Sequence, residues 1–265
     1  MGLELAHQET GSGPPLVILH GLFGSGRNWT RVARQLGEAW RVYAIDLRNH
    51  GDSPWTAEMS YPAMADDVRA FLDQQGLEQV SLVGHSMGGK TAMTLALLHP
   101  DRVKDLIVVD IAPSAYEMTL QAYVDAMQAL DLDSMSRRAE ADAGLQIAVP
   151  DPVIRGFLLQ NLIAKEGQFA WRLNLAALAA GMAAISAFPD ELSERVYTGR
   201  SLFLGGGLSD YIRPKHHADI RRLFPQASIE MVPGVGHWIH AEAPEAFLAQ
   251  LDAFLGNTVG QEGGQ

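Results

Sequence analysis

Short apolar runs that end in turn residues recur along the chain. They read "PLVILHG", "WRVYAID", "QVSLVG", "DLIVVD", "SLFLG" and "SIEMV", and they end at Gly21, Asp46, Gly84, Asp110, Gly205 and Val232. Runs that are apolar at consecutive positions, rather than at every second one, are typical of strands buried on both faces of a parallel sheet. The pattern therefore predicts a set of buried parallel strands.

Between these runs, apolar residues recur at helical spacing. The expected helices are Trp29–Gly37, Tyr61–Gln75, Met87–His99, Pro214–Phe224 and Pro244–Leu255. Three of these helices have a proline in what would be their first turn, where proline is tolerated because that N–H has no helical partner. Strands that alternate with helices indicate an α/β fold, with a mostly parallel central sheet and helices on both faces.

The alternation breaks between about Pro113 and Arg200, where alanine, leucine and methionine dominate and no run resembles a strand. Apolar residues in "FLLQNLI" and "WRLNLAALAAGMAAI" recur at helical spacing instead. We therefore predict an α/β core formed by residues 1–113 and 200–256, with a helical cap insertion over 114–199. The cap either packs as ordinary helices or also covers a site. The polar, glycine-rich residues 257–265 are expected to form a flexible tail.

Composition narrows the class of function. The chain has 20 basic and 31 acidic residues, a formal net charge of −11, which disfavours binding to nucleic acid or anionic lipid. The absence of cysteine excludes thiolate nucleophiles and cysteine-ligated metals. No signal-peptide pattern or run of about 18 apolar residues is present, so we expect a cytoplasmic protein without membrane insertion that acts on a small molecule. The sequence leaves the oligomeric state open.

One serine follows an apolar run at a position where its hydroxyl would not contribute to the packing of a hydrophobic core. The segment Gly84-His85-Ser86-Met87-Gly88 fits the pattern Gly-x-Ser-x-Gly and lies directly between a predicted strand and a predicted helix. In such an elbow the glycines avoid collisions, and the serine hydroxyl points outward at the carboxyl edge of the sheet. The N–H of Met87 then faces the place where an oxyanion would form. The alternative is a serine that only caps the helix.

A nucleophilic serine requires a base and an acid from later segments. In "VPGVGHWIHAE" the glycine-containing turn after a predicted strand favours His237 as the base, with His240 as its competitor. Two carboxylates at strand ends are candidates for the acid. Asp110 ends "LIVVD", and Asp210 lies in "GGGLSDYI" after the next strand. The spacing of the residues leaves the choice between them open.

The motifs resemble those of the α/β-hydrolase superfamily, from "HGLFGSGRNW" through "DLRNHGDS" and "GHSMGG" to "GHWIHAEAPEAF". More closely, "GHSMGGKTAM", "VVDIAPSAY", "GGGLSDYI" and "GHWIHAE" resemble the YbfF-like esterases and their mitochondrial α/β-hydrolase-domain relatives. The wider superfamily would select Asp210 as the acid, whereas the closer subgroup implies Asp110. The resemblance also implies that the loop "HGLFGS" supplies a second oxyanion donor, the N–H of Leu22, with Phe23 as the neighbouring alternative. Arg48, His50 and Ser53 are interpreted as architectural.

These residues imply a serine carboxylesterase or thioesterase. In this hypothesis Ser86 attacks the acyl carbonyl, His237 is the base, Asp110 orients the imidazole, and the N–H groups of Met87 and Leu22 hold the oxyanion, with no metal or organic cofactor. Other hypotheses are acyl transfer, perhydrolysis or C–C bond hydrolysis on the same triad, and a non-catalytic ligand-binding protein.

The substrate pocket is predicted less sharply than the triad. Apolar cap residues are candidates for its wall, and scattered basic residues are candidates for binding the phosphates of an acyl-CoA. The apolar candidates are Met118, Met127, Phe157, Leu158, Phe169, Trp171 and Met182, and the basic ones are Lys90, Arg137, Arg138 and Lys165.

Overall fold

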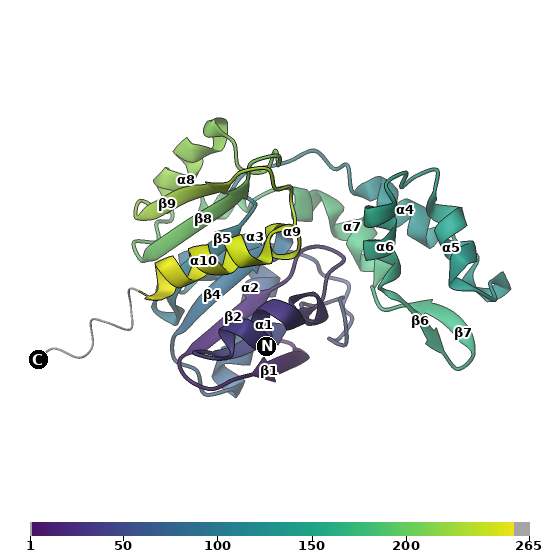
Figure 1. Ribbon diagram of the computed structural model, residues 1–265, viewed down its shortest axis with the longest axis horizontal. Coiled ribbons are helices and arrows are strands. Elements are labelled where there is room, and N and C mark those ends of the chain that lie inside the picture. Colours follow the sequence, from purple (N-terminus) through teal and green to yellow (C-terminus); the bar gives the residue numbers. More distant parts are fainter. Residues whose placement is uncertain (1, 257–265) are drawn as a thin grey trace, which may run out of the picture.

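The central sheet has seven strands, in the order β1-β3-β2-β4-β5-β8-β9, in a computed structural model that describes residues 2–256 (Figure 1). Every neighbouring pair is parallel except β1 and β3. The predicted tail, 257–265, lies outside the described residues. The strands are β1 His7–Thr10, β2 Pro15–Leu19, β3 Arg41–Ile45, β4 Val80–His85, β5 Val103–Val109, β8 Arg200–Gly206 and β9 Ala227–Val232.

Helices cover both faces of this sheet. Side chains of β2 alternate between two apolar clusters, with Val17 in the cluster that includes α2 and α3 and Ile18 in the cluster that includes α1 and α10. Because both faces of the inner strands are buried, these strands are apolar at consecutive positions, and this confirms the predicted fold class. The prediction of a buried strand is wrong for β9, which lies at the edge of the sheet and has only Val232 buried. The helices are α1 Thr30–Leu36, α2 Tyr61–Gln74, α3 Met87–Leu98, α8 His217–Leu223, α9 Ile239–Glu242 and α10 Pro244–Leu255.

Residues 114–199, which we call the cap, contain both helices and a small sheet. Figure 1 shows the cap standing apart from the helices that cover the sheet. Its elements are α4 Gln121–Gln128, α5 Arg138–Leu145, α6 Pro152–Leu159, β6 Leu162–Lys165, β7 Gln168–Trp171 and α7 Leu175–Ser186. The prediction of a strand-free helical insertion is wrong at β6 and β7. The two strands are joined by a two-residue turn, in which φ is positive at Glu166 (53°) and Gly167 (86°). Positive φ at both turn residues is typical of a tight β-hairpin.

Hydrogen bonds fasten the cap to the core near the start and the end of α7. Asn174 Nδ2 donates to Asn49 Oδ1 (3.0 Å). The Nζ of Lys90 donates to the carbonyl oxygens of Ser186 (2.9 Å) and Ala187 (2.6 Å). Burial lowers the pKa of Lys90 to about 7. The ammonium therefore loses charge readily, although it is held at the carboxyl end of a helix, where a cation is favoured.

One stretch around α7 is apolar and long enough to cross a membrane by length and composition alone. It spans Leu175–Leu192 and has a mean hydropathy of 1.3, and 33% of the stretch is buried inside the protein. The helix α7 itself ends at Ser186, and its end is fastened to Lys90. Core helices of globular proteins share this composition, so the stretch alone does not indicate a membrane span.

A buried ion pair joins the loop that follows β3 to α2. Arg48 Nε lies 2.6 Å from Asp67 Oδ2, and the two side chains are 7% and 1% exposed. Arg48 also donates to the carbonyl oxygens of Glu58 (3.2 Å) and Ala63 (3.0 Å), and Asp67 accepts the N–H of Leu3 (2.8 Å). With these bonds both buried charges are satisfied, in agreement with the architectural interpretation of Arg48.

We expect Arg48→Ala to lower the free energy of unfolding by about 3–5 kcal/mol, because it leaves the carboxylate of Asp67 buried without its partner. The control is Arg31→Ala, which removes an ion pair with Glu245 whose side chains are 68% and 75% exposed. That change should cost less than about 1 kcal/mol. Urea unfolding measures both, and equal losses would contradict a structural role for the buried pair.

Candidate active site

Ser86 lies in a sharp turn between β4 and α3. Its φ of 53° and ψ of −118° are strained for a residue other than glycine. A Cβ at Gly84 would lie 2.3 Å from the carbonyl oxygen of Gly88, and one at Gly88 would lie 2.4 Å from that of Leu19. The two glycines are therefore required by close backbone approach, as the motif predicts. Ser86 makes no side-chain capping hydrogen bond among residues 2–256, so the alternative of a simple helix cap gains no support.

His237 follows β9 and lies against a carboxylate. Its Nδ1 is 2.7 Å from Asp110 Oδ2, and its backbone carbonyl oxygen is 2.9 Å from His85 Nε2. The imidazole also packs against the ring of Tyr211, with centroids 4.4 Å apart. A carboxylate at Nδ1 holds a proton on that nitrogen and leaves Nε2 as the acceptor of a neutral ring.

The two candidate acids have different surroundings. Asp110 follows β5 with φ 50°, is fully buried, and accepts the N–H of Gly206 at 2.9 Å and the hydroxyl of Ser209. The side chain of Asp210 is 93% exposed and pairs with Arg213 at 2.6 Å. The structure thus brings Asp110, and not Asp210, to His237. Ser209 had no sequence signal of its own beyond its place in the segment that carries Asp210.

The loop after β2 orients the peptide that precedes Leu22. The carbonyl oxygen of Gly21 is 2.8 Å from His20 Nδ1, and it also accepts the N–H of Gly24 at 2.9 Å. His20 Nε2 accepts the N–H of Leu47 at 3.0 Å, so the ring proton is on Nδ1. In a trans peptide the N–H points opposite to the carbonyl, so these bonds contribute to the orientation of the Leu22 N–H. The N–H of Phe23, the alternative donor, is engaged by His50 Nε2 at 3.2 Å.

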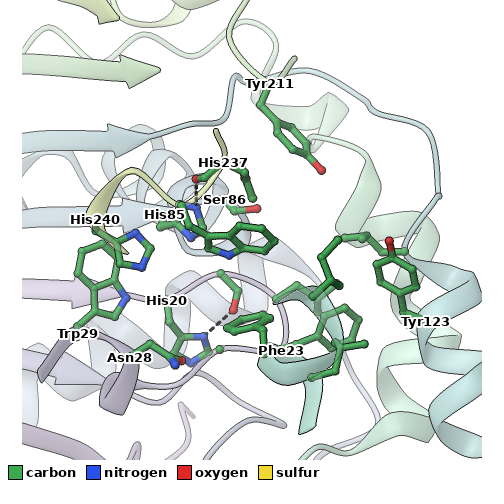
Figure 2. A pocket seen from close by; sticks show the side chains of 18 of the residues that line it. His20, Phe23, Asn28, Trp29, His85, Ser86, Tyr123, Tyr211, His237 and His240 are labelled. Atoms are coloured by element: carbon green, nitrogen blue, oxygen red, sulfur yellow. Dashed lines mark hydrogen bonds between the residues drawn. The ribbon is translucent and has the colours of Figure 1, made fainter. Parts of the chain in front are cut away.

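Ser86 and His237 line a pocket of about 270 Å³ between the core and the cap. Figure 2 shows them between the stacked rings of Trp29 and His240 on one side and Tyr123 of the cap on the other. The core contributes many of the polar groups, and the cap contributes an apolar wall. The apolar wall consists of Leu120, Tyr123, Ile154, Phe157 and Leu158.

The predicted pocket residues are only partly those observed. Phe157 and Leu158 line the pocket, whereas Met127 is fully buried in packing and Met118 is 53% exposed. Met182 lines a smaller neighbouring pocket, which also includes Ser86. Leu120, Tyr123 and Ile154 were missed because helical spacing shows which cap residues are apolar but not which face of the cap meets the core.

The basic candidates for phosphate binding are engaged elsewhere. Lys90 is held by α7, Arg138 donates to the carbonyl oxygen of Leu162 (2.5 Å), and Arg137 pairs with Glu140 (3.2 Å). Lys90 lines the smaller neighbouring pocket that also includes Ser86. In the part of the chain that the structure describes, none of the four basic candidates lines the pocket that Ser86 shares with His237.

Several histidines around the site are buried and lack charge. Burial lowers the pKa of His20 to about 4 and the pKa values of His50 and His240 to about 3. It also lowers the pKa of His85 well below its ordinary value. His240, the competing base, is stacked on Trp29 at a centroid distance of 4.0 Å, and its Nδ1 has no partner within residues 2–256. These rings act as neutral groups, whereas His237 contacts a carboxylate.

Comparisons with known proteins address the family and the class of the protein. Residues 14–244 match the family described as alpha/beta hydrolase fold. The chain is 45% identical to "sn-1-specific diacylglycerol lipase ABHD11" of Mus musculus, over 91% of this chain and 81% of that protein. It is 34% identical to "Esterase YbfF" of Escherichia coli, over 91% and 92%. The solved structure "Marine microorganism esterase" is 40% identical, with a TM-score of 0.92 and coverage of 96% and 100%.

The chain therefore belongs to the α/β hydrolase fold family. Within that family it is an enzyme of the esterase and lipase type. Both statements confirm what the sequence motifs implied.

We expect the free energy of unfolding to fall as the pH falls below about 6.5. The histidines bind protons in the unfolded chain at this pH, whereas burial keeps His240 neutral in the folded protein. The pKa of His240 is lowered in the folded state to about 3, so its contribution is complete above about 6.5 and is lost as the pH falls towards 3. His240→Phe keeps an aromatic ring on Trp29 and removes this titration. The free energy of unfolding of this variant should fall less steeply with pH than that of the parent, and the two slopes should differ by up to about 1.4 kcal/mol per pH unit.

Urea unfolding of both proteins at several pH values between 7.5 and 5 measures this difference. The two stabilities should diverge as the pH falls. Parallel profiles would show that His240 is not kept neutral by burial.

Proposed function

We propose that the chain hydrolyses acyl esters through a covalent acyl intermediate on Ser86. The observation that carries the proposal is the 2.7 Å contact between His237 Nδ1 and the buried Asp110 Oδ2, together with the pocket that His237 and Ser86 both line. Ser86 supplies the hydroxyl, His237 the base and Asp110 a buried carboxylate. This combination matches the roles of a serine hydrolase triad.

The first half of the reaction transfers the acyl group to the enzyme. His237 Nε2 takes the proton of the Ser86 hydroxyl as the oxygen attacks the ester carbonyl. The N–H groups of Met87 and Leu22 stabilise the negative oxygen of the tetrahedral intermediate. The imidazolium, stabilised by Asp110, then gives its proton to the leaving alcohol as the C–O bond breaks.

The second half releases the acid. His237 removes a proton from water as the water attacks the acyl carbonyl, and the proton returns to Ser86 when the acyl–enzyme bond breaks. A thioester would pass through the same steps with a thiol as leaving group. Acceptors other than water would use the same intermediate, so the triad alone does not distinguish hydrolysis from acyl transfer.

The pocket supports a monoacyl ester of short to medium chain length as substrate. Its volume of about 270 Å³ is slightly below the range for drug-sized ligands. The apolar wall from α4 and α6 is suited to a hydrocarbon chain, and the polar core side is suited to the ester group. The similarity to a diacylglycerol lipase makes acylglycerols the natural second ester class to compare.

Hydrolysis of p-nitrophenyl esters from acetate to decanoate tests the proposal. Ser86→Ala should abolish measurable turnover, and Asp110→Asn should lower kcat by about 10³-fold or more, because the imidazole loses its orienting charge. The matched control is Asp210→Asn, which should stay within about twofold of the parent because its carboxylate is solvent-exposed.

The chain-length profile should peak at short to medium acyl groups, and diacylglycerol should be a poorer substrate than a monoacyl ester. Turnover that survives Ser86→Ala would exclude the proposed nucleophile. A loss with Asp210→Asn that equals the loss with Asp110→Asn would exclude the proposed acid.

A further inference from the structure

The loop that carries Leu22 contains a strained residue. Gly21 to Gly24 form a tight turn, closed by the 2.9 Å bond from the Gly24 N–H to the Gly21 carbonyl. The third residue of this turn is Phe23, with φ 64°, a conformation that such turns usually give to glycine. A side chain in this region needs support from its surroundings. The backbone conformation of Phe23, next to Leu22, therefore depends on contacts with other parts of the protein.

Two side chains hold both backbone polar groups of Phe23. On the core side, His50 Nε2 accepts the N–H at 3.2 Å, and His50 Nδ1 lies 2.9 Å from the carbonyl oxygen of Arg48, which fixes the tautomer. On the cap side, Asn161 Nδ2 donates to the Phe23 carbonyl oxygen at 2.8 Å and to that of Leu158 at 3.2 Å. Because both neighbours are carbonyl oxygens, the amide of Asn161 must present its NH₂ group to them.

Asn161 is built into the cap and is not a surface residue. It lies between α6 and β6, is 5% exposed, and its backbone carbonyl oxygen accepts the backbone N–H of Arg172 at 2.8 Å. Leu158, its second acceptor, lines the pocket from α6. Asn161, which holds the loop, thus follows Leu158 of the apolar wall by three positions, and this wall would contact an acyl chain.

The geometry points to Asn161 as a positioning residue: through Phe23 it holds the loop in the conformation in which Leu22 presents its N–H to the oxyanion. The oxyanion site is then complete only while this part of the cap is docked on the core. An acyl chain that packs against α6 favours the docked state, so part of its binding energy appears in kcat and not in KM. This inference rests on the proposed function, because it assumes that the Leu22 N–H stabilises an oxyanion.

The test uses two variants of Asn161 in the full chain. Asn161→Ala removes the amide, and Asn161→Asp replaces the NH₂ donor by an oxygen in a side chain of nearly the same shape. We expect kcat for p-nitrophenyl butyrate to fall by about tenfold or more, with KM within about twofold. The affinity for an alkyl boronic acid, which forms a tetrahedral adduct with a serine, should fall in parallel with kcat, while that for butyrate should not change.

The matched control is Asn174→Ala, which breaks a different asparagine contact between cap and core. Asn174 Nδ2 donates to Asn49 Oδ1 at 3.0 Å and to the Thr56 carbonyl oxygen at 3.2 Å, and neither acceptor belongs to the turn of residues 21–24. It should leave the ratio of boronic acid affinity to butyrate affinity unchanged. If Asn174→Ala lowers kcat and this ratio as much as Asn161→Ala does, the effect is general loosening of the cap and the inference is wrong.

Two further outcomes separate this inference from the proposed function. If the parent enzyme is active and requires Ser86, but both Asn161 variants keep kcat or raise only KM, the positioning role fails and the proposed function stands. If the parent shows no activity that depends on Ser86, the proposed function itself fails, and the role of Asn161 fails with it. Should Asn161→Ala not fold, the same comparisons with Asn161→Asp decide.

Discussion

The close approach of α3 to the ends of β2 and β4 is the constraint on which the site depends. A Cβ at Gly84 or Gly88 would lie within 2.4 Å of backbone oxygen, so the chain can reverse there only with glycine at both positions. The strain of this reversal falls on Ser86, at the carboxyl edge of a sheet buried on both faces. Asp110 leaves the neighbouring strand with positive φ at the same edge, and the loop after β9 brings His237 to it. The parallel sheet thus gathers residues that are far apart in the sequence.

Burial divides the histidines of the site into two kinds. His20, His50 and His85 are at most 3% exposed, carry pKa values lowered by burial, and bond to backbone groups, so they act as fixed donors and acceptors. The side chain of His237 is 20% exposed and shares its Nδ1 with a carboxylate. His237 therefore has a carboxylate partner, whereas burial keeps the rings of His20, His50 and His85 neutral.

The sequence was informative wherever one local rule dominates. Continuous apolar runs located the parallel strands, and the glycine pattern located the turn of Ser86. The polar edge strand β1 was missed because "HQET" has no apolar pattern, and the β6–β7 hairpin was missed because its turn, Glu166-Gly167, was not recognised within a segment read as helical. The choice between Asp110 and Asp210 required the resemblance, since both follow strands. Ser209 and Asn161 could not have been found, because their importance comes from contacts with residues about 100 or more positions away.

The most direct test of the account is the mass of the enzyme during turnover. A reaction with p-nitrophenyl butyrate, quenched in acid in the steady state and digested, should yield the peptide that contains Ser86 with the added mass of one butyryl group. The same peptide from Ser86→Ala should carry no such mass. A butyryl group on another residue, or rapid turnover by the parent enzyme with no adduct at Ser86 under any quench time, would contradict the proposed acyl–enzyme mechanism.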